Sequence, residues 1–343
     1  MGISLSVGQN RQSPGQGYGL VKTDITATPD NVLTLLLTKN FSKLELGFSF
    51  LFLTNLWYAL SKSAFGGGEH LNFPADCLTI KRNSPSVFGR LFIRVVTILL
   101  SIFEVMGNNI VKRILQQNRD LYNGVSKDFS STRNYIWPGL DRFTKMVNDD
   151  GRVLDLGCGN GRLANLFKDR RVKYLGVDFS ENLIKVAQDN FKGVGNVKFE
   201  VGDLLTYKSK DKFDLILAIA SLHHIPTKKE QLRVLKNIFH NLNNDGVVVL
   251  TNWNLLQAKW RPYLFKRSKE FGCGIFNWRD AFIPWKSDPN KEQFRFVHSF
   301  GKNELKRMLK SVGFKIKEIY FEANGKEAGV FDGKNLVVVA YKK

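Results

Sequence analysis

The sequence predicts an α/β fold with a doubly wound, mainly parallel sheet in the C-terminal part of the chain. Three observations predict it. Short apolar runs alternate with helix-like patterns after residue 151, which is typical of parallel strands joined by helices. Several of these runs end at an acidic residue, and such sheets bind their ligands at the carboxyl ends of the strands. A glycine-rich segment directly follows the first run, and glycine lets a backbone turn sharply beside a ligand.

The predicted elements follow one another along this part of the chain. Each strand candidate is a short apolar run, and each helix candidate repeats its apolar residues with a period near 3.6 residues. An initial helix is expected over residues 107–125. After it we expect strands over 152–156, 173–177, 197–201, 213–220, 247–251 and 335–341, with helices over 182–190 and 230–242.

Composition and charge limit the class of protein. Of the 343 residues, 43% are hydrophobic, which permits a sizeable core and excludes a mainly disordered chain. Three widely spaced cysteines predict neither a disulfide framework nor a metal-binding pair, and they fit a reducing, cytoplasmic location. The net charge is +20, and residues 106–343 carry most of it, with 42 Lys and Arg against 25 Asp and Glu. Such a charge favours a polyanionic partner, with nucleic acid first and an anionic membrane surface second.

Residues 1–105 form an N-terminal extension that does not continue the α/β pattern. Its first 19 residues are rich in Gly, Ser and Gln, which is typical of disorder. Apolar runs over 46–60 and 91–106 are shorter than the ~20 residues of a membrane-spanning helix. Three interpretations stay open: a small domain, a segment that contacts a membrane through 46–106, or sequence upstream of the true translation start. The domain that carries function is expected over 106–343.

The glycine-rich turn over residues 157–161 has the sequence GCGNG. A dinucleotide-binding turn would have a glycine at the next position, so that a pyrophosphate rests on a helix N-terminus. Arg162 occupies that position instead, and Asp155 precedes the turn by two residues. Because a carboxylate beside the turn would repel a phosphate, the segment indicates a cationic ligand.

The pattern D-x-G-x-G-x-G over residues 155–161 resembles motif I of the class I S-adenosylmethionine-dependent methyltransferases. The resemblance implies a Rossmann-like fold with a seven-stranded sheet, and S-adenosylmethionine as the cofactor. In that family a second acid takes both ribose hydroxyls, which a carboxylate can do through two charge-assisted hydrogen bonds. A third acid contacts the adenine amino group, and residues 218–224 resemble motif IV. The cofactor-binding residues that the resemblance implies are Asp155, Gly157, Gly159, Gly161, Asp178, Phe179, Asp203, Leu204 and Ala220.

Residues 129–138, with the sequence FSSTRNYIWP, resemble a segment of the tRNA wobble-uridine methyltransferases. These enzymes esterify 5-carboxymethyluridine, so the resemblance implies a tRNA-modifying enzyme whose partner is tRNA. In some lineages they work with a small zinc-binding activator subunit. The resemblance extends over about 110–343 and departs from the family at 228–229, where a looser lysine pair replaces its basic pair.

Methylation of a carboxylate needs no general base, because the acid is already ionised at pH 7. The site then needs groups that orient the two substrates. Arg133 is expected to hold a carboxylate, either that of the acceptor or that of the cofactor's methionine tail. Tyr135 and Trp137 are candidates for stacking on the uracil, and His224 is a candidate for hydrogen bonding to the acceptor. These four residues are the predicted catalytic set.

Residues 254–300 form an insertion on the substrate side. It carries nine Lys and Arg, four Asp and Glu, and 11 aromatic residues. Cations mixed with aromatic rings suit single-stranded RNA, but the same composition fits a cap packed over the pocket. The alternative function is a small-molecule methyltransferase acting on a quinone, a lipid or another metabolite, with His224 as the base. A catalytically idle RNA-binding or partner-binding module is disfavoured by the intact motif I.

Overall fold

The computed structural model describes the following stretches of the chain: 3–6, 24–27, 87–133, 135–264, 277–285 and 293–343. The chain divides into two units, Met1–Asn83 and Ser84–Lys343. In the first unit β1 (Ile3–Ser6) pairs antiparallel with β2 (Asp24–Ala27). The apolar run predicted over 46–60 lies outside the described residues.

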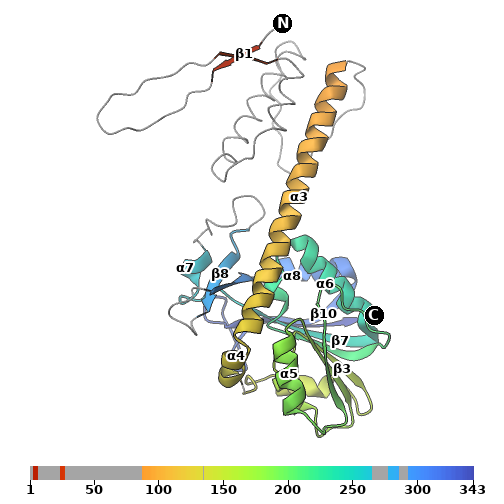
Figure 1. Cartoon of the computed structure of the whole chain (residues 1–343). Helices are drawn as coiled ribbons and strands as arrows, with labels where there is room; N and C mark the ends of the chain where they lie inside the picture. The colour runs from red at the N-terminus through yellow and green to blue at the C-terminus, as the bar shows by residue number, and fades with distance from the viewer. Residues whose placement is uncertain (1–2, 7–23, 28–86, 134, 265–276, 286–292) are drawn as a thin grey trace, which may run out of the picture. The chain divides into compact units, whose positions relative to one another are not determined.

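A mixed sheet forms the centre of the second unit (Figure 1). Its strands are β3 (Arg152–Leu156), β4 (Lys173–Asp178), β5 (Val197–Val201), β6 (Phe213–Ile219), β7 (Leu242–Trp253), β10 (Phe314–Ala323), β11 (Lys326–Ala328) and β12 (Asn335–Lys342). They lie in the order β11-β10-β12-β7-β6-β3-β4-β5. The strands from β7 to β5 pair in parallel, and β12 runs antiparallel to both its neighbours. The predicted doubly wound, mainly parallel fold is confirmed, and β11 is a short addition to the seven implied strands.

The strand bounds follow the predicted apolar runs. β3 and β5 begin and end at the predicted residues. β7 begins at Leu242 instead of residue 247, but its pairing with β6 is interrupted directly afterwards. Asp245 has a φ of 60° in this interruption. The polar residues 243–246 therefore form a bulge, and regular pairing resumes at Val247.

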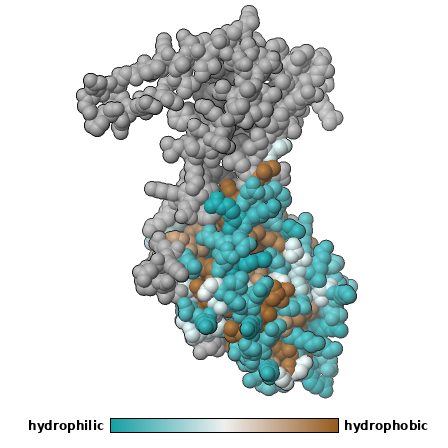
Figure 2. Space-filling view, in the orientation of Figure 1, coloured by the Kyte–Doolittle hydropathy of each residue, from teal (hydrophilic) through white to brown (hydrophobic). Residues whose placement is uncertain are grey.

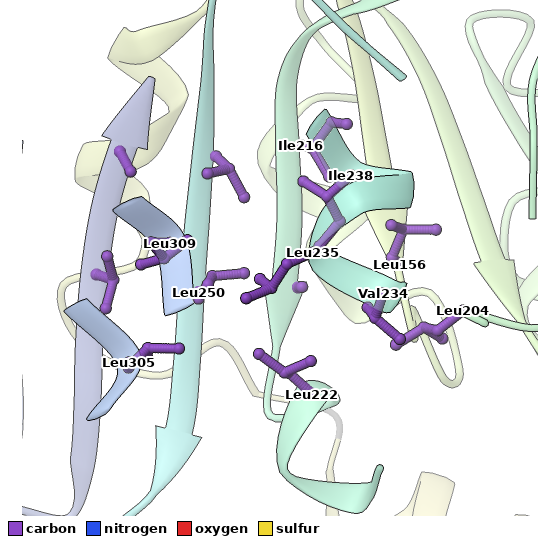
Figure 3. Packing of buried hydrophobic residues seen from close by; sticks show 14 of the residues in the cluster. Leu156, Leu204, Ile216, Leu222, Val234, Leu235, Ile238, Leu250, Leu305 and Leu309 are labelled. Atoms are coloured by element: carbon purple, nitrogen blue, oxygen red, sulfur yellow. The ribbon is translucent and has the colours of Figure 1, made fainter. Parts of the chain in front are cut away.

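Helices cover both faces of the sheet. Their bounds are α3 (Val87–Gly124), α4 (Ser126–Thr132), α5 (Glu181–Asn190), α6 (Lys228–Asn241), α7 (Arg261–Leu264) and α8 (Lys302–Val312), with 3-10 turns η1 (Asp141–Met146), η2 (Arg162–Leu166) and η3 (Leu222–His224). Figure 3 shows apolar side chains of α6 and α8 against β6 and β7 on one face. Within β6, Ile216 packs on that face and Leu217 on the other, with η1 and η2. Burial of both faces explains the continuous apolar runs.

Helix α3 is longer than the helix predicted over 107–125. It begins at Val87, so the expected boundary between residues 105 and 106 lies inside one helix. Within the described residues, no helix combines the length and apolar content needed to cross a membrane. Figure 2 shows a mainly hydrophilic described surface on this side of the molecule, with apolar residues in small separate patches.

The predicted insertion contains an antiparallel hairpin of β8 (Asp280–Trp285) and β9 (Gln293–His298). The C-terminal half of α3 packs on this hairpin, where Ile114 and Phe296 are buried against each other. The side-chain oxygen of Asn118 accepts a hydrogen bond of 3.0 Å from the backbone N–H of Phe296. The hairpin and α3 thus form one side of the cavity described next.

Candidate active site

A pocket lies at the carboxyl ends of the central strands. β4 and β6 flank β3 on opposite sides, so the order of the strands reverses here, which is where doubly wound sheets bind ligands. Residues that follow β3, β4 and β6 line the pocket, together with α3, α4 and β9. The three acids that the sequence places at strand ends, Asp155, Asp178 and Asp203, meet in this one cavity as predicted.

The glycine-rich turn after β3 needs glycine for two different reasons. Gly157, Gly159 and Gly161 all have positive φ, of 81°, 56° and 77°. Gly157 and Gly159 line the pocket, and a Cβ at Gly159 would lie 3.2 Å from the Phe129 ring. Gly161 is outside the lining, and a Cβ there would lie 2.7 Å from the Phe199 ring. A Cβ at Gly157 would lie 2.5 Å from the Cβ of Ser221. All three positions therefore need glycine for their positive φ and for close packing, Gly157 and Gly159 beside the cavity and Gly161 in the core.

Asp155 places an unsatisfied carboxylate oxygen in the pocket wall. Its Oδ2 accepts a hydrogen bond of 2.6 Å from the Tyr174 hydroxyl, while its buried Oδ1 has no partner in the described structure. Burial raises the pKa of Asp155 to about 7, against the opposing effects of Tyr174 and Arg162. A buried polar atom without a partner is costly, so this oxygen suits a cationic ligand.

Asp178 is held rigidly at the end of β4. Its two oxygens accept hydrogen bonds of 2.9 Å from the backbone N–H groups of Gly159 and Ser180. Ser180 in turn caps α5, because its hydroxyl accepts from the backbone of Leu183. Burial raises the pKa of Asp178 to about 6, and the backbone hydrogen bonds oppose this rise. Each oxygen keeps a second lone pair for a ligand hydroxyl.

The third acid and its neighbours form a more open part of the lining. Asp203 accepts a hydrogen bond of 2.8 Å from Leu205 N–H and pairs with Arg119 of α3 at 3.0 Å. Phe179 and Leu204 add apolar surface to the same pocket. Ala220, on the other side, has a φ of 56°, and its N–H donates to the backbone oxygen of Thr251. All of these predicted residues line the cavity.

The other end of the pocket combines arginines with aromatic rings. The Cζ atom of Arg133 lies 4.8 Å from the ring centroid of Phe129 and 4.7 Å from that of Trp285. The Cζ atom of Arg295 lies 4.4 Å from Trp253 and 4.8 Å from the same Trp285. In the described part of the chain neither guanidinium has an ion-pair partner. This end of the pocket is therefore cationic.

His224 lies between these two ends and is fully engaged. Its Nδ1 donates to the backbone oxygen of Phe296 at 2.7 Å, since that oxygen can only accept. Its Nε2 is then an acceptor and lies 2.9 Å from the Tyr122 hydroxyl. Burial lowers the pKa of His224 to about 3. The neighbouring His223 is fully buried and accepts a hydrogen bond from Trp253 N–H, so it has a structural role.

The two remaining residues of the predicted catalytic set, Trp137 and Tyr135, lie in different environments. Trp137 lines the pocket, with the Cζ atom of Arg162 4.7 Å from its ring centroid. Tyr135 does not line it: its side chain is 58% exposed, and its backbone oxygen accepts from Arg162 at 3.4 Å. The pocket thus brings together Arg133, Trp137 and His224 of the predicted catalytic set.

Comparison with known proteins identifies the family of this fold. Residues 130–319 match the model of a family described as a methyltransferase domain. The chain belongs to this methyltransferase family. Its membership confirms the predicted enzyme class, the Rossmann-like fold and S-adenosylmethionine as the cofactor.

Three similar curated proteins carry the same name, tRNA (carboxymethyluridine(34)-5-O)-methyltransferase. The Arabidopsis thaliana protein is 28% identical over 158 residues, covering 44% of this chain and 37% of that protein. The Xenopus tropicalis protein is 26% identical over 286 residues, covering 69% and 41%. The Saccharomyces cerevisiae protein is 27% identical over 175 residues, covering 50% and 57%. The methyltransferase chain thus spans about half the length of these relatives or less.

The pocket of the methyltransferase fits S-adenosylmethionine. The unpartnered Oδ1 of Asp155 suits the amino group of the methionine tail, and the fixed carboxylate of Asp178 suits the ribose hydroxyls. Gly157 and Gly159 bring the backbone of the turn to the wall of the pocket, where a ligand can approach it closely. The role of each residue stays a prediction, but the carboxylates that line the pocket match the amino and hydroxyl groups of S-adenosylmethionine.

Sequence reasoning did not find Arg295. It lies in the segment FRFVHSF over residues 294–300, whose composition is mainly aromatic and apolar. The available signal was a charged residue among apolar ones, because Arg295 stands between Phe294 and Phe296 and the last four residues of β9 are all buried. Its partner across the pocket, Trp253, likewise follows a strand candidate that was predicted to end at residue 251.

Proposed function

We propose that this methyltransferase transfers a methyl group from S-adenosylmethionine to the carboxylate of 5-carboxymethyluridine at the wobble position of tRNA. One observation carries the proposal. A single pocket joins an acidic end, suited to a cationic methyl donor, to an arginine end without counter-charges, suited to an anionic acceptor. The names of the relatives support tRNA as the acceptor.

At the acidic end, bound S-adenosylmethionine supplies an electrophilic methyl group. Asp155 would hold its amino group through Oδ1, and Asp178 would accept its ribose hydroxyls. Asp203 and the apolar side chains of Phe179 and Leu204 would face the adenine. These contacts orient the donor, and orientation is a large part of catalysis in such a displacement.

At the arginine end, the acceptor carboxylate needs orientation rather than a base. A guanidinium can hold a carboxylate through two parallel hydrogen bonds. His224 is consistent with a reaction that needs no base, because its Nε2 already accepts a hydrogen bond from Tyr122 and burial lowers its pKa to about 3. A neutral hydroxyl acceptor, as in the small-molecule alternative, would need a base with a free acceptor atom, and His224 does not offer one.

Aromatic residues of the insertion support RNA binding and a cap at the same time. Trp260 stacks on Trp253 of the pocket with ring centroids 5.9 Å apart, as expected for a cap. Trp278 is 57% exposed, and the Cζ atom of Arg279 lies 4.3 Å from its ring. An exposed ring beside a cation suits an unstacked base and its phosphate. Both predicted interpretations of 254–300 therefore have support.

A small activator subunit is part of this proposal. β5 is the terminal strand of the sheet, so its outer edge presents backbone groups that a partner strand can pair with. Val201 at the end of β5 is 52% exposed, which is unusual for a strand valine and suits an apolar contact. Addition of a purified activator should raise methyl transfer, and Val201→Lys should reduce that gain without affecting S-adenosylhomocysteine binding.

The test uses the full chain, methyl-labelled S-adenosylmethionine and two tRNA samples, with and without the carboxymethyl group on the wobble uridine. Label should enter only the carboxymethylated tRNA, and mild alkali should release it as methanol, because a methyl ester is base-labile. Arg133→Met should abolish incorporation while leaving the fold intact. Alkali-stable label, or no label even with an activator present, would contradict the proposal.

A further inference from the structure

Arg295 is a buried cation without a counter-charge in the described part of the chain. Its side chain belongs to β9 and the residue is only 5% exposed. Its Nε atom is buried and has no hydrogen-bond partner. Burying an unpaired charge is unfavourable, and contact with the rings of Trp253 and Trp285 compensates only in part. The described part of the fold therefore holds the Arg295 cation in place without neutralising its charge.

A second cation lies beside it. Arg133 and Arg295 both contact the ring of Trp285, and both line the pocket. Their like charges repel, and burial together with the charge of Arg295 lowers the pKa of Arg133. An anion bound to both guanidinium groups would relieve the repulsion and satisfy their free N–H groups.

A different arginine serves the donor end of the pocket. Arg162 interacts with the charge of Asp155 and lies over the ring of Trp137. This position beside the motif I acid suits the carboxylate of the methionine tail. Arg295 contacts neither residue and sits on the hairpin side, against Trp253 and Trp285. Beyond the effect of burial, Arg133 is close enough to lower the pKa of Arg162 and to have its own pKa lowered by Arg295, so Arg295 is the arginine set apart from the donor end.

We propose that Arg295 and Arg133 form an anion site that selects an acceptor with a free carboxylate and releases the methyl ester. The inference rests on the proposed function. In the reaction, one carboxylate oxygen forms a bond to the methyl carbon while the methyl–sulfur bond breaks, leaving its electron pair on sulfur. No proton moves, and both the negative charge of the acceptor and the positive charge of the donor disappear. The neutral ester has lost the charge that the two arginines hold, so it binds more weakly than the acid.

The test measures binding of anticodon stem–loop RNAs to the full chain with S-adenosylhomocysteine present. Three RNAs differ only at the wobble uridine, which carries a 5-carboxymethyl acid, its amide or its methyl ester. The wild type should bind the acid about tenfold or more tightly than the amide and the ester, since hydrogen bonds to charged groups are worth that much. Arg295→Met should bind all three RNAs with similar affinity. Arg295→Lys keeps the charge without the planar fork and should retain part of the preference.

Arg142→Met is the matched control. Arg142 also lies over two aromatic rings, at 4.9 Å from Phe143 and 5.5 Å from Tyr320, but it is outside the pocket and pairs with Glu318. This variant should keep the wild-type preference for the acid. Unchanged S-adenosylhomocysteine affinity would show that each variant is folded.

The outcomes separate the inference from the function on which it rests. Equal binding of the three RNAs by a wild type that methylates the acid RNA would overturn the anion site alone. A full preference for the acid in Arg295→Met would also overturn it. A wild type that neither binds nor methylates the acid RNA would overturn both the proposed function and the inference.

Discussion

The Tyr122 hydroxyl donates a hydrogen bond of 2.9 Å to Nε2 of His224, and this contact determines what the histidine can do. The other ring nitrogen donates to the backbone oxygen of Phe296, so both nitrogens are occupied. With its pKa lowered by burial to about 3, His224 is neutral at physiological pH. His224 therefore holds the Tyr122 side chain and the backbone of Phe296 in place, and it is a poor general base.

The variant Tyr122→Phe tests whether His224 is a general base, because the two possibilities predict opposite changes in kcat. The change removes a buried hydrogen bond, so we expect a loss of about 1 kcal/mol in the free energy of unfolding and a lower kcat. If His224 were a base, freeing its Nε2 would preserve or raise kcat and add an ionisation to the pH–rate profile. Steady-state kinetics between pH 6 and 9 would distinguish the two, with Tyr263→Phe as a tyrosine control outside the pocket.

Cofactor binding should weaken in mild acid. The pKa of Asp178 is raised by burial to about 6 and that of Asp155 to about 7. Below these values the carboxyls are protonated, so Asp178 accepts ribose hydroxyls less well and Asp155 loses its attraction for the amino group. Calorimetry should show S-adenosylhomocysteine affinity falling about tenfold or more from pH 8 to pH 5.

Asp178→Asn isolates the contribution of that residue. It should weaken S-adenosylhomocysteine binding at pH 8 and flatten the acid dependence, whereas Asp189→Asn at an exposed position of α5, the helix that follows β4, should change neither. An affinity that is independent of pH in the wild type would contradict the assignment of both acids.

The buried His298 should make the protein less stable to unfolding at alkaline pH. His298 contacts Asp280 at 2.5 Å and Glu304 at 3.2 Å, joining the hairpin to α8. Burial lowers its pKa, but the two carboxylates more than offset this and raise it to about 9. Because the folded-state pKa exceeds the ordinary value, the stabilisation is fully present below about pH 6.5 and is lost as pH rises through 9.

The measurement is urea unfolding of the wild type and His298→Gln at pH 6, 8 and 10. The difference in the free energy of unfolding should be about 3 kcal/mol larger at pH 6 than at pH 10. A difference that stays constant over this range would show that His298 is not protonated in the folded protein.

Gly161 and Gly193 form a matched pair for testing the glycine-rich turn. Both have positive φ, but a Cβ at Gly161 would meet the Phe199 ring at 2.7 Å, while one at Gly193 would meet nothing within 4 Å. Gly193→Ala should therefore lose only the backbone term, about 1 kcal/mol. Gly161→Ala should lose about 3 kcal/mol, because overpacking adds to the strain. Thermal unfolding of both variants checks the order, and equal losses would be inconsistent with the packing role of Gly161.

Local patterns were sufficient for much of the fold and for the acidic end of the pocket. β3 and β5 match their predicted bounds because a strand buried on both faces is a continuous apolar run in the sequence. The acids at the ends of β3 and β4 could also be predicted to lie together, since parallel strands present their carboxyl ends at one edge of the sheet. A helix such as α3 was harder to delimit, because its bounds depend on what it packs against as well as on its period.

Local sequence patterns were enough to predict the class of fold, the glycine-rich turn and the acids at the strand ends, because each depends on a short stretch of the chain. The arrangement of the arginine end became known from the three-dimensional fold alone. The fold brought Arg295 beside Arg133, left Tyr135 at the surface and closed both nitrogens of His224 with Tyr122 and Phe296. These contacts join helix, turn and hairpin across long sequence separations, and no local periodicity encodes which side chains meet there.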